Sequence, residues 1–389
     1  MQVKRISTVI LVAAAALILL LPPAILQAAP HRQLIASEGK GYLETVDGYR
    51  VLHLKGSPHE MGFQHGVLLK DAIRDNVGFM LTRGIDDDIR IGGMKVTSTM
   101  IASVLLGAFE ERVPQRFVDE MNALAEGADL PAWQVRATNL IPEMMHCSGF
   151  ALLSKATAEG KLYHGRVLDY GVSIKLQNHA VLTIQEPDGK VPFVNVSYAG
   201  FIGSVTGMNL AGISIGEMGG GGVGLWNGVP MSFLVRMVLE DARTLDQAIG
   251  VFKDNPRTCE YYYVIADAAS DDAVGIKAMP DTLEIVRPGE SHPQLPHPVE
   301  NTILMSADQR YLNLARLVKA GCGTFTEQSA IRLMDAPVAM KSNLHDALMV
   351  PEDAVIYVAN AHPDGSPAWK QKYYRFDIHE LMHTRPQEK

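Results

Sequence analysis

The chain has 389 residues, of which 47% are hydrophobic and 20% charged, and its formal net charge at pH 7 is −8. A mildly acidic chain without a basic cluster is a poor nucleic-acid binder, so we exclude nucleic acid and expect a small-molecule partner. The length is sufficient for a large core, in one big domain or two smaller ones.

The first 28 residues have the layout of a secretory signal peptide. A positively charged start and an unbroken apolar run over residues 9–21 are followed by small residues at Ala28 and Ala29. The run is shorter than the ~20 apolar residues of a membrane helix, although an apolar zone stretched to residues 6–26 would let an uncleaved signal act as an anchor. We expect an exported protein, periplasmic or secreted, whose only membrane contact would be such a signal.

Residues 29–146 are expected to form a mostly helical N-terminal segment. Two short strands come first, over residues 40–55. Ser57, Pro58 and Glu60 then supply the N-cap, the first-turn proline and the capping box of a helix. From there the pattern predicts helices to the end of the segment.

From residue 147 the pattern changes to β-hairpins of antiparallel type. Three turns separate the strands of these hairpins: Glu159-Gly160, Asp188-Gly189 and Asn209 to Gly212. Helices and further strands follow toward the C-terminus. The alternation of helical groups with hairpins predicts an α+β fold in which helices pack on antiparallel sheets.

Two segments resemble a metal-binding and a phosphate-binding motif, but each lacks a residue that its motif requires. His59 belongs to an incomplete HExxH pattern, because Phe63 stands where the second histidine is needed. The glycine-rich loop at residues 216–228 lacks the Lys-Ser/Thr of a phosphate-binding loop. We therefore expect neither a metal ion nor an organic cofactor.

Cys147 is the candidate nucleophile. Cys259 and Cys322 could pair in an oxidising compartment, which would leave Cys147 as the odd thiol. By composition alone a buried structural cysteine is the commoner case. Arg166 and Asp169 on the returning strand favour a reactive cysteine instead, because a nearby guanidinium stabilises the thiolate. The structural alternative is that Arg166 and Asp169 form a surface ion pair, which contributes little to stability.

A cut between His146 and Cys147 would join these features in one chemical scheme. Cys147 would gain a free α-amino group with a reference pKa of roughly 7.7–8.0, which suits a general base near neutral pH. Nucleophile and base would then belong to one residue, as in N-terminal nucleophile (Ntn) catalysis. The same thiol could make the cut by attacking the His146 carbonyl.

The segment CSGFALLSKATAEGKLYHGRVLDY resembles the nucleophile hairpin of the acyl-CoA:6-aminopenicillanic acid acyltransferase family. These are cysteine Ntn hydrolases, in the superfamily of choloylglycine hydrolase and penicillin V acylase. Four further blocks resemble the family in the same order: GSPHEMGFQHG, GMNLAGISIGEMGG, SADQRYLNLARLV and SNLHDALMVPEDAVIYVANA. The resemblance thus runs from about residue 50 to 360.

The resemblance implies a four-layer αββα sandwich of two antiparallel sheets, preceded by a helical propart. It implies self-cleavage before Cys147 into a retained N-terminal chain, residues 29–146, and a catalytic chain, residues 147–389. It also implies hydrolysis or transfer of an acyl group at a linear amide, without a cofactor.

Five positions match the site of the family. By resemblance Cys147 is the nucleophile, Arg166 and Asp169 are its charged neighbours, Asn209 is an oxyanion-hole residue, and Arg310 is a second site arginine. Each of the last two has a structural alternative. The asparagine is also typical of a hairpin turn, and the arginine could begin a helix and form a surface pair with an aspartate two residues earlier.

The chain departs from the family at two places. The family's Thr-Asn pair near the site reads Ser306-Ala307-Asp308 here, and Ser148 follows the nucleophile where relatives often have threonine. His146, before the expected cut, is bulky.

Two other functions remain open from the sequence. One is an acyl-lipid hydrolase of phospholipase B-like or lipid amidase type. The other is an inactive exported binding protein that keeps the fold. The sequence does not indicate the acyl group, the leaving amine, the choice between water and an acceptor, or an oligomeric state.

Overall fold

The computed structural model describes residues 30–83, 90–91, 94–95, 98–140, 147–221 and 224–386. The expected signal peptide and His146 lie outside the described residues. Residues 32–389 form one compact unit. Among the described helices, none combines the length and the hydropathy that a bilayer crossing requires.

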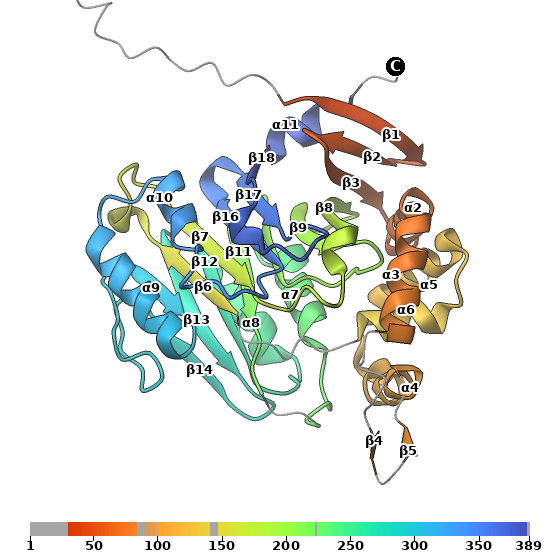
Figure 1. The fold of residues 1–389 in the computed structure, drawn as a ribbon, viewed down its shortest axis with the longest axis horizontal. Coiled ribbons are helices and arrows are strands. Elements are labelled where there is room, and N and C mark those ends of the chain that lie inside the picture. Colours follow the sequence, from red (N-terminus) through yellow and green to blue (C-terminus); the bar gives the residue numbers. More distant parts are fainter. Residues whose placement is uncertain are drawn as a thin grey trace, which may run out of the picture. The chain divides into compact units, whose positions relative to one another are not determined.

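Two sheets form the centre of the compact unit (Figure 1). The larger sheet has, in spatial order, β1 (Arg32–Glu38), β2 (Gly41–Val46), β3 (Tyr49–Gly56), β8 (Ala180–Pro187), β9 (Phe193–Tyr198), β10 (Thr206–Asn209), β11 (Ile213–Met218), β12 (Tyr261–Asp267), β13 (Asp272–Ala278) and β14 (Leu283–Val286). The smaller sheet has β15 (Thr302–Met305), β6 (Ser148–Leu152), β7 (Tyr163–Leu168), β16 (His345–Val350), β17 (Val355–Asn360) and β18 (Tyr374–Asp377). A separate short ribbon pairs β4 (Arg90–Ile91) with β5 (Met94–Lys95).

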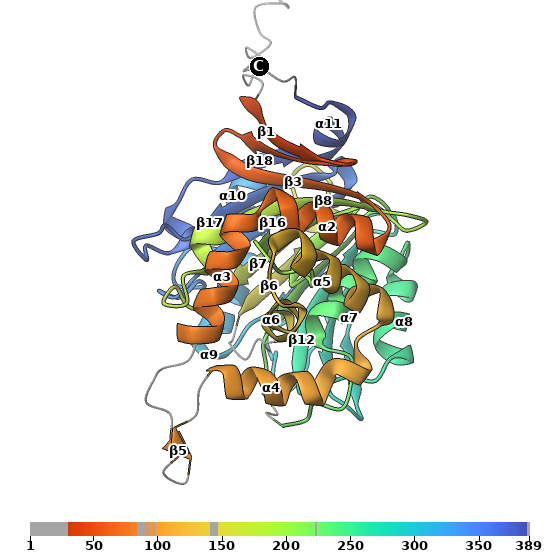
Figure 2. The same ribbon diagram turned by 90° about the vertical axis from the view of Figure 1, so that its right-hand side faces the viewer.

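Helices cover the outer faces of both sheets. The helices that precede β6 in the chain are α2 (Pro58–Leu68), α3 (Lys70–Arg83), α4 (Ser98–Phe109), α5 (Gln115–Ala128) and α6 (Ala132–Asn139). Those after it are α7 (Met231–Asp241), α8 (Leu245–Asp254), α9 (Asp308–Gly321), α10 (Glu327–Arg332) and α11 (Ile378–His383). Apolar residues of α2, α5, α7 and α8 share one core with the larger sheet. Figure 2 shows these helices beside that sheet. Those of α9 and α10 share another with the smaller sheet.

The order of layers is therefore helix, sheet, sheet, helix. Strands β6 and β15 of the small sheet contact β12 and β13 of the large one, and a further apolar core fills the space between them. The expected α+β fold with an αββα arrangement is confirmed. The three expected hairpins are also present, as β6–β7, β8–β9 and β10–β11.

One pair of strands differs from the expected all-antiparallel pattern. β3 and β8 run parallel, with Val51 opposite Leu182. A parallel pair needs a long crossover connection. The chain between the two strands supplies it, because it contains the N-terminal helices and the β6–β7 hairpin of the other sheet. The N-terminal segment thus contributes three strands to the larger sheet as well as helices.

Local sequence signals explain how the N-terminal segment enters its first helix. The Ser57 hydroxyl accepts a hydrogen bond from the Glu60 backbone N–H at 3.2 Å, and the Glu60 carboxylate accepts one from the Ser57 N–H at 2.8 Å. Pro58 occupies the first position of α2. The predicted capping box is confirmed, and it fixes the direction in which α2 leaves β3.

Candidate active site

Cys147 lies directly before β6, at the edge of a cavity between the two sheets. Its residue surface is only 2% exposed. In the β6–β7 register Ser148 faces Val167 and Gly149 faces Arg166. The hairpin therefore brings Arg166 within two residue positions of Cys147 along β6, as its turn signal predicts.

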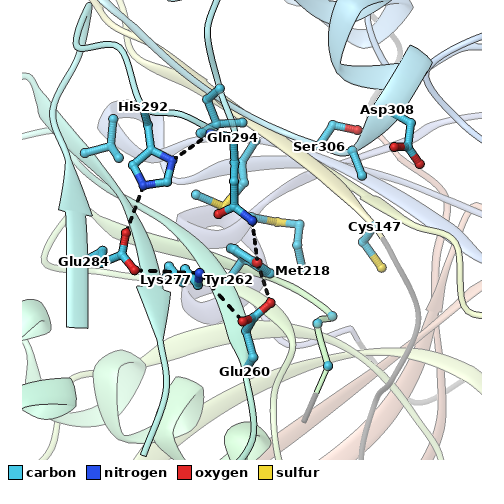
Figure 3. A pocket seen from close by; sticks show the side chains of 17 residues that line it. Cys147, Met218, Glu260, Tyr262, Lys277, Glu284, His292, Gln294, Ser306 and Asp308 are labelled. Atoms are coloured by element: carbon cyan, nitrogen blue, oxygen red, sulfur yellow. Dashed lines mark hydrogen bonds and ion pairs between the residues drawn. The ribbon is translucent and has the colours of Figure 1, made fainter. Parts of the chain in front are cut away.

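The cavity that Cys147 lines has a volume of about 540 Å³. Figure 3 shows the cysteine on one side, near Ser306 and Asp308, and a polar wall on the other. The lining residues are Cys147, Met218, Gly219, Gly220, Gly221, Glu260, Tyr262, Lys277, Glu284, Val286, His292, Gln294, Leu295, Met305, Ser306, Ala307 and Asp308. This volume is within the range of about 300–1,000 Å³ that is typical of small-molecule sites.

A chain of polar contacts leads from the cavity to Asp169. The hydroxyl oxygens of Ser306 and Ser148 are 2.7 Å apart. Arg310 Nη1 lies 3.5 Å from the Ser148 hydroxyl and 2.7 Å from Asp169 Oδ2. The structure thus brings Asp169 and Arg310, two of the predicted site residues, together behind the two serines.

Chemistry sets the direction of one hydrogen bond in this chain. A guanidinium has only donors, so Arg310 donates to the Ser148 oxygen. Either serine hydroxyl can donate to the other, and when Ser148 donates, the Ser306 proton is able to point into the cavity. The surface pair of Arg310 with Asp308, which the sequence left open, is replaced by this buried pair with Asp169.

Asp169 is a fully buried carboxylate at the end of β7. Its Oδ1 accepts the backbone N–H of Met340 at 3.0 Å, and Oδ2 accepts Arg310. Burial raises the pKa of Asp169 to about 6, because loss of water outweighs the hydrogen bond from Met340 and the charges of Arg310 and Arg166.

Arg166 is fully buried and connects the two sheets. It extends from β7, and its Nε and Nη2 donate to the backbone carbonyl of Glu217 on β11 at 3.0 and 2.7 Å. The Glu217 carboxylate lies 3.5 Å from Nη2. A surface ion pair between Arg166 and Asp169, the structural alternative from the sequence, is not what the structure contains, because both side chains are buried.

Asn209 is placed away from the cavity, at the C-terminal end of β10. Its amide nitrogen donates to the carbonyls of Leu239 and Ala242 at 3.1 and 2.7 Å. Its oxygen accepts the N–H groups of Ala211 and Ile213, each at 3.0 Å. The side chain therefore closes the hairpin turn and anchors the end of α7, which corresponds to the turn alternative and leaves no amide proton for an oxyanion at Cys147.

All three cysteines are free thiols. The disulfide between Cys259 and Cys322 that the sequence left open is therefore not formed. Cys259 is buried, with its sulfur 3.7 Å from the Leu225 carbonyl, and Cys322 is partly exposed, with its sulfur 3.7 Å from the Glu300 carbonyl. The sulfurs of Cys259 and Cys322 thus each lie near a different backbone carbonyl.

Sequence reasoning missed most of the cavity wall. In the sequence, Ser306 stands out only as a departure from the family, and no motif marks Glu260, Lys277, Glu284 or His292. Lys277 and Glu284 lie on β13 and β14, whereas the other three lie between elements, so no local spacing groups these residues. Within the described part of the chain, no cluster of three or more metal-ligating side chains is found.

Comparison with known families gives one match within the chain. The model of the family described as acyl-coenzyme A:6-aminopenicillanic acid acyl-transferase matches residues 156–292. The matched range contains Arg166 and Asp169 but neither Cys147 nor Arg310. It agrees with the expected resemblance over these residues.

Similarity to individual proteins is more distant. Protein dcd1B of Dictyostelium discoideum is 24% identical over 398 residues, covering 90% of this chain and 78% of that protein. The N-acylethanolamine-hydrolyzing acid amidase of Mus musculus is 22% identical over 193 residues; the match spans 44% of this chain and about half, 49%, of the amidase. Among solved structures, the Caenorhabditis elegans N-acylethanolamine-hydrolyzing acid amidase ortholog has 18% identity and a TM-score of 0.44, covering 59% of this chain and 100% of that one.

Proposed function

We propose that this protein is an exported cysteine Ntn hydrolase that hydrolyses or transfers an acyl group at a linear amide. The match of residues 156–292 to the acyltransferase family model supports the proposal. One observation carries the proposal: Cys147 lies directly before β6 and lines a cavity of about 540 Å³. The mouse relative that is by name an amidase supports the amide as the bond attacked.

The catalytic form arises by processing. Cleavage between His146 and Cys147 releases the α-amine of Cys147, whose reference pKa of roughly 7.7–8.0 makes it a base near neutral pH. The Cys147 thiol attacks the preceding carbonyl, and the C–N bond breaks to leave a thioester and the free α-amine. Water then hydrolyses the thioester, which releases the carboxylate of the N-terminal chain and restores the thiol. The protein then consists of residues 29–146 and residues 147–389, after removal of the signal peptide.

Turnover follows the same chemistry. The Cys147 sulfur attacks the substrate carbonyl carbon while its thiol proton passes to the α-amine. The tetrahedral intermediate collapses to a thioester as the C–N bond breaks, and the α-amine returns the proton to the leaving amine. Water or an acceptor amine then attacks the thioester, and the thiol is regenerated.

The oxyanion needs a donor at the cavity. We assign this role to the Ser306 hydroxyl, since Ser148 can donate to Ser306 and Arg310 can donate to Ser148. Asn209 lacks a free amide proton for it. Asp169, paired with Arg310 at 2.7 Å, keeps the far end of this chain in position.

The proposal is tested by replacing the nucleophile. We expect Cys147→Ala to abolish both chain cleavage and amide turnover, because the same sulfur performs both reactions. Intact-protein mass spectrometry with sequencing of each fragment's first residues measures cleavage, and two chains, one beginning Cys-Ser-Gly-Phe, are expected for the unaltered protein. The matched control is Cys322→Ala, which removes a thiol outside the cavity and should leave both reactions unchanged.

Two results would count against the proposed function. Turnover that persists in Cys147→Ala would contradict the mechanism. A single uncut chain with an unreactive Cys147 would favour the binding-protein alternative. Turnover is measured on a panel containing penicillin V, conjugated bile salts, acyl-homoserine lactones and N-acyl amino acids, since the pocket shape decides which acyl amide is accepted.

A further inference from the structure

The side of the cavity away from Cys147 is a row of polar side chains across three strands. Tyr262 on β12 is the register partner of Lys277 on β13, and Lys277 is the partner of Glu284 on β14. Register partners point to the same face of a sheet, so the three side chains stand side by side. With Glu260 and His292 they form what we call the charged wall (Figure 3).

Hydrogen bonds fix the outer groups of the charged wall. The Tyr262 hydroxyl donates to Glu260 Oε1 at 2.5 Å, and His292 Nε2 lies 2.9 Å from Glu284 Oε2. Lys277 Nζ sits between the two carboxylates, 3.7 Å from Glu260 Oε2 and 3.7 Å from Glu284 Oε1. The lysine is thus farther from both partners than the 2.7–2.9 Å typical of a charge-assisted hydrogen bond.

The charges of the cavity do not cancel. Among the described lining residues the carboxylates are Glu260, Glu284 and Asp308, and the only lysine or arginine is Lys277. The side chains of Lys277, Glu260 and Glu284 are 20%, 26% and 45% exposed, so they are reached by solvent and by a ligand. The lining thus has three carboxylates against one lysine, an excess of acidic groups.

This excess discriminates between the groups that a substrate could carry. An alkyl chain against the charged wall would remove water from charged groups and offer no hydrogen bond in return, which costs free energy. A carboxylate would add a fourth negative charge. An ammonium offers three donors to carboxylate oxygens and reduces the excess charge.

We propose that the substrate of this site carries a cationic group, such as a primary ammonium, which binds the charged wall while the scissile amide lies at Cys147. This specificity rests on the proposed amidase or acyltransferase function and names its substrate class. It disfavours a plain long-chain acyl group in the part of the cavity that the wall borders.

The first test uses amides that differ only at one end. One series has 4-nitroaniline as the leaving amine and 6-aminohexanoyl, hexanoyl or 5-carboxypentanoyl as the acyl group. The other has an acetyl group on 1,5-diaminopentane, pentylamine or 5-aminopentanoate. We expect the ammonium compound to have the highest kcat/KM in at least one series, because either side of the amide could extend to the wall.

Substitutions in the charged wall then measure how much its residues contribute to kcat/KM for the ammonium compound. Glu260→Gln and Glu284→Gln should each lower kcat/KM for the ammonium compound about fivefold, the size of one charge contact in water. Lys277→Met should raise it, since the competing cation is lost. The matched control is Glu186→Gln, which makes the same change in the Lys55–Glu186 pair outside the cavity. Preference for the alkyl compound in both series, or a preference unchanged in the glutamine variants, would overturn the proposal.

A second measurement does not depend on amide turnover. Cys147 is labelled with cationic 2-aminoethyl, neutral methyl or anionic 2-sulfonatoethyl methanethiosulfonate, and peptide mass spectrometry follows each thiol. Labelling of Cys322 in the same sample serves as the internal control. The cationic reagent should be favoured at Cys147, less so in Glu284→Gln and more so in Lys277→Met.

The two measurements separate the two proposals. Equal labelling by the three reagents, or faster labelling by the anionic one, contradicts a cation-selective cavity. A protein that cleaves no amide but keeps the charge selectivity at Cys147 contradicts the proposed function, and the cation-selective cavity then stands by itself.

Discussion

At the scale of single residues, Asp169 is a buried carboxylate whose charge state decides how Arg310 is positioned. Only the ionised form attracts the guanidinium at full strength, and Arg310 in turn donates to Ser148 beside the cavity. Burial raises the pKa of Asp169 to about 6. The site therefore contains a group that titrates between its usual range and neutral pH.

We expect the proposed turnover to fall as the pH is lowered through about 6, because protonation of Asp169 weakens its pair with Arg310.

The effect of Asp169 on the free energy of unfolding changes with pH in the opposite direction. The folded state has the higher pKa, so this group favours folding most below pH ~4, the unfolded value, and loses that contribution as the pH rises toward 6. The measurement is kcat/KM against pH for the unaltered protein and Asp169→Asn.

The Asp169→Asn variant is the control for assigning the pH dependence to Asp169. Asp169→Asn has no charge to lose, so its lower activity should show no limb near pH 6. An acid limb at the same pH in both proteins would assign the titration to another group.

Gly216 on β11 is the position at which a single methyl group should disturb Arg166. A Cβ there would lie 2.7 Å from Arg166 Cγ. We expect Gly216→Ala to lower the free energy of unfolding by about 1–3 kcal/mol, as overpacking in a core does. Urea denaturation measures this change.

The control for this substitution is Gly78→Ala on α3, where a Cβ meets nothing within 4 Å. Alanine in an exposed helix should instead increase stability by roughly 0.5–1 kcal/mol. Equal effects of the two substitutions would mean that the approach of Arg166 to β11 is not tight.

At the scale of elements, a buried ion network joins α5 of the N-terminal segment to α7 of the catalytic segment. Arg236 donates to both Glu120 oxygens at 2.8 and 2.6 Å, and to Glu240 at 2.9 Å. Arg236 is fully buried and Glu120 is 1% exposed. The guanidinium also lies over the Phe117 ring, 5.0 Å from its centre.

We expect Glu120→Ala to destabilise the protein by about 3–5 kcal/mol, because it leaves the Arg236 charge buried without its main partner. Urea denaturation measures the change. The comparison is Arg74→Ala, which breaks a solvent-exposed pair with Asp129, directly after α5, and should cost less than about 1 kcal/mol.

A double variant separates the charge from the packing. Replacing Glu120 and Arg236 together by leucine removes both charges and should recover most of the stability lost in Glu120→Ala. If the double variant is as unstable as the single one, shape rather than uncompensated charge explains the loss.

At the scale of the whole compact unit, the N-terminal segment is part of the central architecture. Strands β1 to β3 extend the ten-stranded sheet through the parallel β3–β8 pair, and α2 packs against α5 within the same core as α7 and α8. We therefore expect the two chains of the processed protein to stay together without a covalent bond.

Size-exclusion chromatography in buffer and electrophoresis in detergent measure this association. One peak that contains both chains, followed by two bands after denaturation, is the expected result. Two peaks from a processed sample in buffer would contradict it, and Glu120→Ala should be the variant most prone to such separation.

The sequence by itself determined the features that depend on residues close together in the chain. The Ser57–Glu60 capping box, the three hairpins after residue 147 and an α+β class with helices packed on antiparallel sheets follow from caps, turn residues and alternation. The αββα order of the layers followed from the family resemblance instead. The placement of Cys147 before β6 follows from the local pattern. The cut at this residue stays a prediction, since it is a reaction rather than a feature of the fold.

Only the tertiary structure decided which distant residues meet. Asp169 and Arg310 are brought together across 141 positions, and Asn209, which matches a site residue by its motif, uses its amide to close a turn. The charged wall depends on which strands are neighbours, and the parallel β3–β8 pair depends on a long crossover. The physical reason is that turn, cap and strand preferences act over a few residues, whereas charge pairing and cavity lining depend on burial and register that the whole core imposes.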